Sequence, residues 1–207
     1  TTRVASNWSP EHLAAILKDI NTRSSVGPVV VSIKGDEPTI QPEVKTLLEN
    51  LESPQRVTLK IITNLQVIPT WLVLAPENLK ATEIGVSIEG VEDTYEYSRH
   101  LGSWQEFDAN VKQIAVLRLP RTTLQFKVTH SNHTIGDMDR LFDYLDYHEQ
   151  QSQWQKTGPR GRSNTVHGPE YLNPQQLPQR VREQLLECSR RITPQLAKIL
   201  SHTQPDS

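Results

Sequence analysis

The stretch VVVSIKGDEP, at residues 29–38, decides the fold of this chain. Its first half is a short run of β-branched apolar residues, which is typical of a strand in a parallel sheet. Its second half turns abruptly polar, with a glycine, two acids and a proline in succession. The stretch therefore predicts a strand whose carboxyl end carries a turn with chemically useful side chains.

Three further apolar runs resemble the first, and we expect four strands near residues 29–34, 57–62, 83–88 and 122–129. Between them lie segments in which apolar residues recur at helical spacing, and Ser9 and Pro10 form a start signal for a first helix. Strand and helix in alternation predict an α/β fold with parallel strands neighbouring one another in chain order and helices on one outer face. This alternation fits either an open sheet or a partial, open barrel, and because a helix comes first, we expect a leading strand to be missing.

Composition excludes several classes of protein. The chain has 207 residues, a net charge of −2 and no apolar run near the roughly 18 residues of a membrane span, which argues against a membrane protein. Balanced charge argues against a dedicated nucleic-acid binder. The single cysteine, Cys188, excludes an internal disulfide and is expected to be structural, and the cytoplasm is the expected compartment. Since no initiator Met is present, we expect the chain to begin inside a longer product.

The chain is expected to have three parts. Residues 1–149 hold the α/β core, residues 150–164 form a polar linker, and residues 165–207 form a C-terminal helical extension. The segment 150–162 lacks an apolar period, so we expect it to be exposed and sensitive to proteases.

Polar residues follow every predicted strand. They are Gly35, Asp36 and Glu37 after the first, Thr63 and Asn64 after the second, Ser87 at the end of the third, and Asn132 after the fourth. Ligands bind at the carboxyl ends of parallel strands, so these residues are expected to line one cleft. The spacing of His130 and His133 is compatible with a metal, but no third ligand accompanies them, so we predict a loop feature and no metal site.

The same residues resemble motifs of the radical S-adenosylmethionine (SAM) superfamily, in particular of its twitch-domain-containing members. KGDEPTI at 34–40 is similar to the Gly-Gly-Glu-Pro motif, ITN at 62–64 to the Thr-Asn strand end, and VSIEG at 86–90 to the Ser-Ile-Asp-Gly element. YEYSRH at 95–100, followed by Trp104 and Asn110, is similar to the next segment of the family, and 164–172 with Leu177-Pro178 to its C-terminal stretch. The resemblance covers about Trp8 to Leu186.

The resemblance implies a partial (β/α)6 barrel in which SAM chelates a [4Fe–4S] cluster held by a C-x-x-x-C-x-x-C loop after the first strand. This chain has no such loop. The resemblance implies that Gly35 to Pro38, with Asp36 and Glu37, meet the SAM amino group, and that Ser87 and Arg99 meet its carboxylate or ribose. Asn132 is then expected near the ribose, and Thr63 and Asn64 on the same rim. Two residues depart from the family, because Asp36 and Leu65 stand where it has glycine.

Two functions remain open. In the first, the chain is part of an enzyme whose cluster is bound upstream and which modifies a peptide or other substrate through radical chemistry. In the second, it is a cluster-free descendant that serves as a binding or structural subunit of a larger assembly. The absent initiator Met and the helix-first order favour the enzyme lineage, whereas Asp36 and Leu65 favour the descendant. No catalytic residue is assigned from the sequence.

Overall fold

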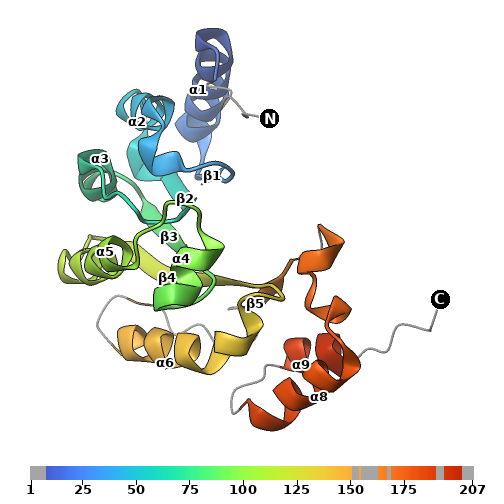
Figure 1. Cartoon of the computed structure of the whole chain (residues 1–207). Helices are drawn as coiled ribbons and strands as arrows, with labels where there is room; N and C mark the ends of the chain where they lie inside the picture. The colour runs from blue at the N-terminus through green and yellow to red at the C-terminus, as the bar shows by residue number, and fades with distance from the viewer. Residues whose placement is uncertain (1–7, 151–153, 155–162, 167–168, 190–193, 202–207) are drawn as a thin grey trace. The chain divides into compact units, whose positions relative to one another are not determined.

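The computed structural model describes residues 8–150, 154, 163–166, 169–189 and 194–201. Its strands, seen in Figure 1, are β1 Val29–Ile33, β2 Val57–Thr63, β3 Ala81–Ile88, β4 Thr122–His130 and β5 Ser163–Thr165. The helices are α1 Pro10–Val26, α2 Pro42–Glu49, α3 Thr70–Leu74, α4 Glu92–Ser98, α5 Trp104–Val116, α6 Met138–Glu149, α8 Gln179–Cys188 and α9 Pro194–Ser201. Short 3-10 turns lie between them: η1 Pro38–Ile40, η2 Pro54–Arg56, η3 Ala75–Glu77, η4 Ile135–Asp137, η5 Glu170–Leu172 and η6 Pro174–Gln176.

The strands form one open sheet in the order β1-β2-β3-β4-β5. Strand β1 pairs in parallel with β2, and β2 in parallel with β3, with Val29 opposite Val57 and Thr58 opposite Ala81. The four predicted strands and their chain order are confirmed, and so is the α/β class. Strand β5, which pairs in parallel with the end of β4, was not predicted because a three-residue strand without an apolar run leaves no periodic signal.

Local sequence signals explain where the elements begin. Helix α1 starts at Pro10, and the backbone N–H of His12 donates to Oγ of Ser9 at 3.3 Å, as the predicted capping signal requires. Proline also stands at the first position of α2 and of the turn η1. A fixed φ and a missing N–H make proline suitable there and unsuitable farther inside a helix.

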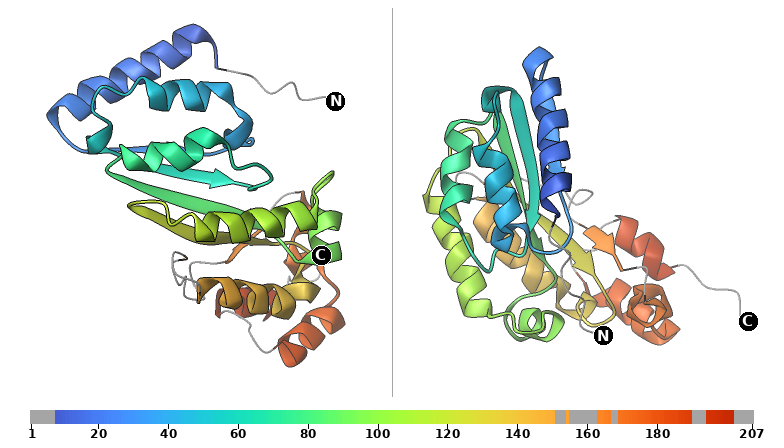
Figure 2. Two further views of the ribbon diagram at one scale, coloured as in Figure 1. Left: turned by 90° about the vertical axis from the view of Figure 1, so that its left-hand side faces the viewer. Right: turned by 90° about the horizontal axis from the view of Figure 1, so that it is seen from above.

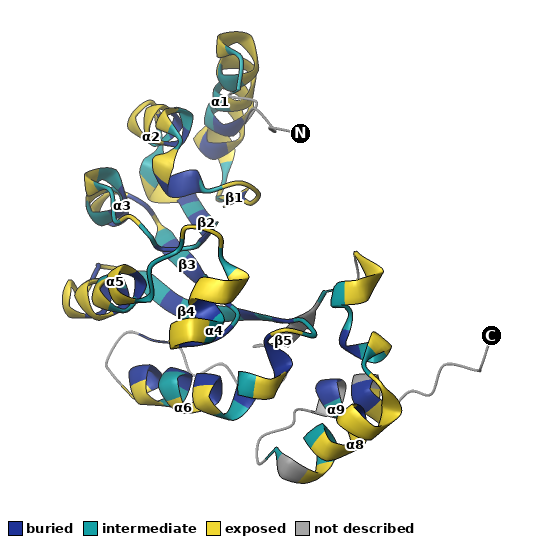
Figure 3. Ribbon diagram, in the orientation of Figure 1, coloured by how far each residue is buried: buried dark blue, intermediate teal, exposed yellow. Residues whose placement is uncertain are grey.

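The chain divides into two compact units, which are described separately. The first comprises Thr1–Val86 and Ala109–Leu124, and the second comprises Ser87–Asp108 and Gln125–Ser207. In the first unit, α2 and α3 cover one face of the sheet, as Figure 2 shows, and Ile20 of α1 belongs to the same buried cluster. One cluster of buried residues there consists of Ile20, Ile33, Val44, Leu47, Leu51, Val57, Leu59 and Leu79. Figure 3 shows β2 with dark, buried stretches.

The opposite face of these strands is half-exposed, although the apolar runs predict strands buried on both faces. Side chains of β2 alternate between buried and half-buried along its whole length, and Val30 of β1 is 60% exposed. On this face Lys60 and Glu83, which are opposite one another in the register, form an ion pair at 2.8 Å. The helices therefore cover one face only of these strands, and the other carries polar and charged groups.

Aromatic side chains dominate the core of the second unit. Tyr95 and Phe107 are fully buried and their ring centroids lie 4.7 Å apart, while Phe126 stacks on Trp154 at 4.0 Å. Trp154 lies within the predicted linker and is 4% exposed, and Asn164 belongs to β5. Residues 151–153 and 155–162 lie outside the described residues, so the predicted protease sensitivity and domain boundaries stay predictions.

In the part of the chain that the structure describes, none of the helices combines the length and the apolar character that crossing a membrane requires.

The half-open sheet can be tested by truncating one side chain on each face. Leu59→Ala removes a fully buried side chain of β2 and is expected to lower the free energy of unfolding by about 2–5 kcal/mol. Val30→Ala, on the open face of the neighbouring strand, is the matched control and should cost less than about 1 kcal/mol. Urea denaturation measures both, and equal losses would contradict the assignment of the two faces.

Candidate functional site

The turn after β1 has an unusual backbone. Gly35 has a φ of 93° and Asp36 a φ of 39°, so two consecutive residues lie in the left-handed region. An added Cβ at Gly35 would meet nothing within 4 Å, so the need for glycine there comes from φ alone. The turn exposes the side chain of Asp36 and leads into η1, whose N-cap is Glu37.

Glu37 ties the end of β1 to the end of β2. Its Oε1 accepts hydrogen bonds from the backbone N–H of Thr39 at 3.1 Å, the Thr39 hydroxyl at 2.6 Å and the Thr63 hydroxyl at 2.6 Å. Its Oε2 accepts from the backbone N–H of Asn64 at 2.6 Å. Oε1 thus accepts three hydrogen bonds and Oε2 one, all of them from groups of this protein. Glu37 therefore acts chiefly on the protein itself.

The turn after β2 is also held by several hydrogen bonds. Leu65 has a φ of 54° although it is not glycine, and its side chain is fully buried. Its N–H donates to the Thr63 hydroxyl at 2.9 Å, and Oδ1 of Asn64 accepts from the N–H of Gln66 at 3.0 Å. From α5, the amide of Asn110 donates to the carbonyls of Leu65 and Gln66, both at 2.9 Å. Buried contacts and hydrogen bonds thus offset the backbone strain of Leu65.

Arg99 and Ser87 contact one another in the second unit, and the carboxylate of Glu89 pairs with Arg99 there. Nε of Arg99 donates to Glu89 Oε2 at 2.6 Å, and Nη2 donates to Oε1 at 2.9 Å. Nη2 also donates to the carbonyl and the hydroxyl of Ser87, at 3.0 and 2.8 Å. The Arg99 and Glu89 side chains are 19% and 20% exposed. The guanidinium edge formed by Nε and Nη2, which suits a ligand carboxylate, is thus paired with Glu89.

Gly90, which follows Glu89, lies very close to Thr94 of α4. An added Cβ there would lie 2.4 Å from Cγ2 of Thr94, which is closer than real side chains approach. Glycine at this position lets the first turn of α4 pack against the chain that carries Ser87 and Glu89.

Asn132 fastens the end of β4 to the C-terminal segment. Its Nδ2 donates to the carbonyl of Tyr171 at 2.7 Å, and its backbone N–H donates to the carbonyl of Leu172 at 3.0 Å. Among the described residues, its Oδ1 is buried and has no hydrogen-bond partner. A buried acceptor without a donor costs free energy.

The predicted site residues thus fall into two groups. Gly35, Asp36, Glu37, Thr63 and Asn64 form a hydrogen-bonded group in the first unit. Ser87 and Arg99 contact one another in the second unit, where Asn132 makes its bonds to Tyr171 and Leu172 instead. That all of them line one cleft stays a prediction.

Sequence reasoning left three participants out of the site. Glu89 follows Ser87 by two residues, a spacing that places two strand residues on one face, so the sequence did carry a signal for it. Asn110 lies 45 residues beyond Leu65, and Tyr171 lies 39 residues beyond Asn132. Neither contact leaves a local pattern that a single sequence could reveal.

The two histidines near the end of β4 have different surroundings. His130 is fully buried at the end of β4, and the exposed His133 lies with its ring centroid 5.5 Å from that of Tyr97. The described residues contain no group of three or more His, Cys, Asp or Glu side chains that could hold a metal ion. With one cysteine in its sequence, the chain cannot supply the three thiolates of a [4Fe–4S] cluster.

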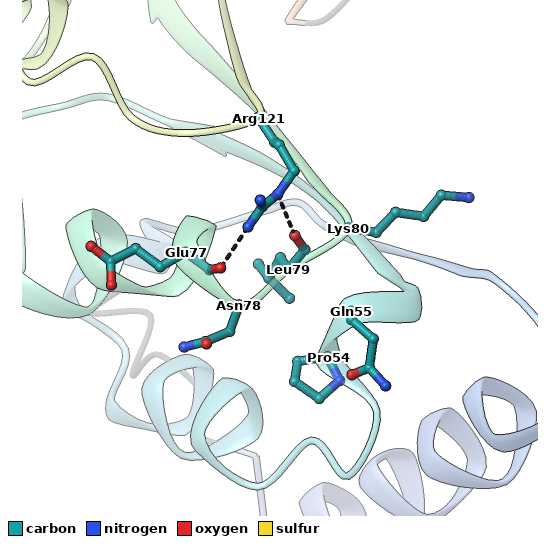
Figure 4. A pocket seen from close by; sticks show the side chains of 7 residues that line it. All are labelled: Pro54, Gln55, Glu77, Asn78, Leu79, Lys80 and Arg121. Atoms are coloured by element: carbon teal, nitrogen blue, oxygen red, sulfur yellow. Dashed lines mark hydrogen bonds between the residues drawn. The ribbon is translucent and has the colours of Figure 1, made fainter.

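A separate hollow of about 500 Å³ lies at the other end of the strands (Figure 4). It is lined by Pro54, Gln55, Glu77, Asn78, Leu79, Lys80 and Arg121. Arg121, just before β4, donates to the carbonyls of Leu79 and Pro76, both at 3.0 Å, and to that of Glu77. Its guanidinium therefore caps the carbonyls that precede β3, and we interpret the hollow as a structural end of the sheet.

Comparison with known proteins shows the fold. No protein-family model and no curated protein matches the sequence. The crystal structure of Streptococcus suis SuiB bound to S-adenosylmethionine is similar to 84% of this chain, with a TM-score of 0.56 and 15% identity. A second crystal structure of SuiB covers 84% with a TM-score of 0.58 and 14% identity. The open parallel sheet is similar to the fold of these two structures, and at this identity the likeness is one of fold alone. The chain spans 37% and 39% of the two SuiB chains.

The connection made by Glu37 can be tested directly. Glu37→Gln replaces one carboxylate oxygen by an NH2 group that cannot accept, so either the bond from the Asn64 N–H to Oε2 or the three bonds to Oε1 are lost. We expect the free energy of unfolding to fall by about 1–3 kcal/mol. Glu49→Gln, whose side chain is 59% exposed, is the control and should change it by no more than about 0.5 kcal/mol. Equal effects in urea denaturation would show that the four bonds contribute nothing.

His130 gives the protein a pH-dependent stability. Burial lowers the pKa of its imidazole from 6.5 to about 4. The unfolded chain therefore binds this proton below about pH 6.5, whereas the folded chain does so only near pH 4. The stability is present above pH 6.5 and is lost as the pH falls toward 4, by about 3 kcal/mol. Denaturation of wild type and His130→Gln across this range should show a smaller loss in the variant, and parallel curves would contradict the assignment.

Proposed function

We propose that this chain is the SAM-binding core of a radical-SAM-like protein. The observation that carries the proposal is the set of polar side chains at the carboxyl ends of the four main strands, on a fold similar to that of a SAM-bound protein. Parallel α/β sheets bind ligands at these ends. The residues of the first unit suit the amino group of SAM, and those of the second unit suit its carboxylate and ribose hydroxyls.

The first unit supplies acceptors for a cationic group. The turn after β1 presents the exposed carboxylate of Asp36, and Glu37 holds this turn against Thr63 and Asn64. An ammonium is well matched to a carboxylate and to backbone carbonyls. In this proposal the amino group of SAM binds at the turn, and Glu37 positions it.

The second unit supplies groups for an anion and for hydroxyls. Arg99 keeps Nη1 outside its bonds to Glu89 and Ser87, and a ligand carboxylate can accept from this nitrogen. Oδ1 of Asn132 is buried without a donor among the described residues, and a ribose hydroxyl would satisfy it. These contacts orient SAM and perform no bond cleavage themselves.

Radical chemistry needs more than this chain holds. A [4Fe–4S] cluster supplies the electron that cleaves SAM reductively, and the residues of this chain do not fit such a cluster. We therefore propose that an enzyme built on this core takes its cluster from cysteines outside the 207 residues and acts on a peptide or other substrate. No step of that reaction is assigned to a residue here.

The second candidate, a cluster-free binding or structural subunit of a larger assembly, is favoured by one specific contact. Glu89 already gives Arg99 the bidentate carboxylate partner that a ligand would otherwise provide. In a protein that does not bind SAM, Arg99 would serve only to hold Glu89 and Ser87 in place.

SAM binding and the role of Arg99 can be measured by calorimetry on the purified chain. Arg99→Ala removes the cation and leaves the Glu89 carboxylate uncompensated, so it should weaken SAM binding by about 1.5–3 kcal/mol, or tenfold and more. Arg99→Lys keeps the positive charge but lacks the forked donor geometry, so its affinity for SAM should lie between those of wild type and Arg99→Ala.

Arg23→Ala, which removes an arginine of α1 that is 68% exposed, is the control and should bind SAM like wild type. Thermal denaturation of each variant separates unfolding from lost affinity. No SAM binding by the wild-type chain would favour the cluster-free subunit. Wild-type affinity in Arg99→Ala would remove Arg99 from the site.

A further inference from the structure

Strand β1 forms one edge of the sheet, and β2 is its only strand neighbour in the part of the chain that the structure describes. Natural edge strands are usually protected against further pairing by a charged side chain, a proline or a bulge. None of the five residues of β1, Val29–Ile33, is charged or a proline. The outer backbone groups of this edge are therefore open to pairing with a further extended segment.

The side chains of β1 are also less buried than those of the strand beside it. In the parallel register Val31 lies opposite Leu59, so the two share one face of the sheet. Leu59 is fully buried, whereas Val31 is half-buried, and Val29 differs from its partner Val57 in the same way. The difference arises because β2 has a strand on each side and β1 has a strand on one side.

A hollow of about 640 Å³ lies between this edge and helix α1, which Figure 1 shows at the same end of the sheet. Its apolar lining includes Ile20 and Val26 of α1 and residues 29–31 of β1. The two charged residues that line it, Asp19 and Arg23, pair with one another at 2.8 Å. Because these charges neutralise one another, the hollow favours an uncharged, apolar occupant.

An extended peptide segment fits the edge and the hollow together. Its backbone pairs with the edge of β1, and because side chains alternate along a strand, every second one points to the face on which the hollow lies. A second copy of this chain fits less well. Two paired β1 strands would lie about 4.8 Å apart, whereas the two α1 helices beside them need about 8–10 Å between their axes.

We propose that the free edge of β1 binds an extended peptide, whose alternate apolar side chains enter the hollow beside α1. Because β1 leads into the turn at residues 35–37, one end of the bound segment then lies beside this turn. In the proposed function SAM binds at the turn, and the docked strand presents the adjoining residues of a peptide substrate to it. That use of the edge rests on the proposed function, whereas the binding of a peptide does not.

Hydrogen exchange on the whole chain, measured without SAM, tests the docking. The probe is the synthetic peptide acetyl-Lys-Val-Thr-Val-Thr-Val-Lys-amide, which has valine at every second position. At saturation it should slow exchange of the outward-facing amides of β1 about tenfold or more and leave the amides of β2 unchanged. A control peptide with proline in place of each threonine lacks the N–H groups for pairing and should have no effect.

Three results of this measurement would overturn the proposal. They are exchange in β1 that the probe does not slow, equal slowing by the proline peptide, and protection of β1 without any peptide. Protection that rises with protein concentration would assign the edge to a second copy of the chain instead.

Two matched variants locate the binding surface. Val26 ends α1 beside the hollow and is 86% exposed, and Val116 ends α5 and is 79% exposed. Val26→Lys replaces apolar surface at the hollow by a charge and should weaken binding of the probe about tenfold, whereas Val116→Lys should bind it like wild type. Equal affinities in the two variants would overturn the assignment to the hollow.

A nitroxide label at either end of the probe shows where the bound peptide lies. From one of the two ends it should broaden the amide NMR signals of residues 34–37, because β1 ends there. Broadening from neither end would overturn the placement beside the turn. Wild type that binds the probe but not SAM would overturn the proposed function and leave the docking edge standing. Wild type that binds SAM but not the probe would overturn the docking edge alone.

Discussion

The carboxylate of Glu37 is the interaction on which the candidate site of the first unit depends. By accepting from Thr39, Thr63 and Asn64, it joins a turn after one strand to a turn after its neighbour, 26 residues farther along the chain. Both turns contain left-handed residues, whose backbone conformation is strained unless the residue is glycine. One partly buried charge with four donors therefore maintains two strained turns, and it does so at the end of the sheet where parallel α/β proteins bind ligands.

The second unit uses a comparable arrangement with the opposite charge. Arg99 is oriented by Glu89 and Ser87, and its guanidinium carbon lies 5.5 Å from the centre of the Tyr95 ring. The pairing of Arg99 with Glu89 has two opposite effects on the affinity for a ligand anion. It fixes the geometry of Arg99 in advance, which reduces the entropy lost on binding, but the negative charge of Glu89 lowers the attraction for a second carboxylate.

The balance between these two effects distinguishes the two functions considered for the chain, a SAM-binding core and a structural subunit. A SAM-binding core needs the remaining donors of Arg99 and the buried acceptor of Asn132 to be used by a ligand. A structural subunit needs only the internal pairs. As a replacement for glycine in the motif that the sequence resembles, Asp36 favours the second function, whereas its exposed carboxylate after β1 can still pair with an ammonium. The pairing of Arg99 with Glu89 also favours the second.

The sequence by itself determined the alternation of strands and helices, the chain order of the four main strands and the polar strand ends, because hydrophobic period and turn residues are local signals. It also marked Asp36 and Leu65 as departures from the glycines of the motifs that it resembles, and both residues have positive φ in the structure. Only the tertiary structure decided which carboxylate holds the turn and which is exposed, since Glu37 and Asp36 are adjacent acids with the same local chemistry. The contacts of Asn110 and Tyr171, and strand β5, likewise depend on residues about 40 positions apart, and no local pattern encodes such distances.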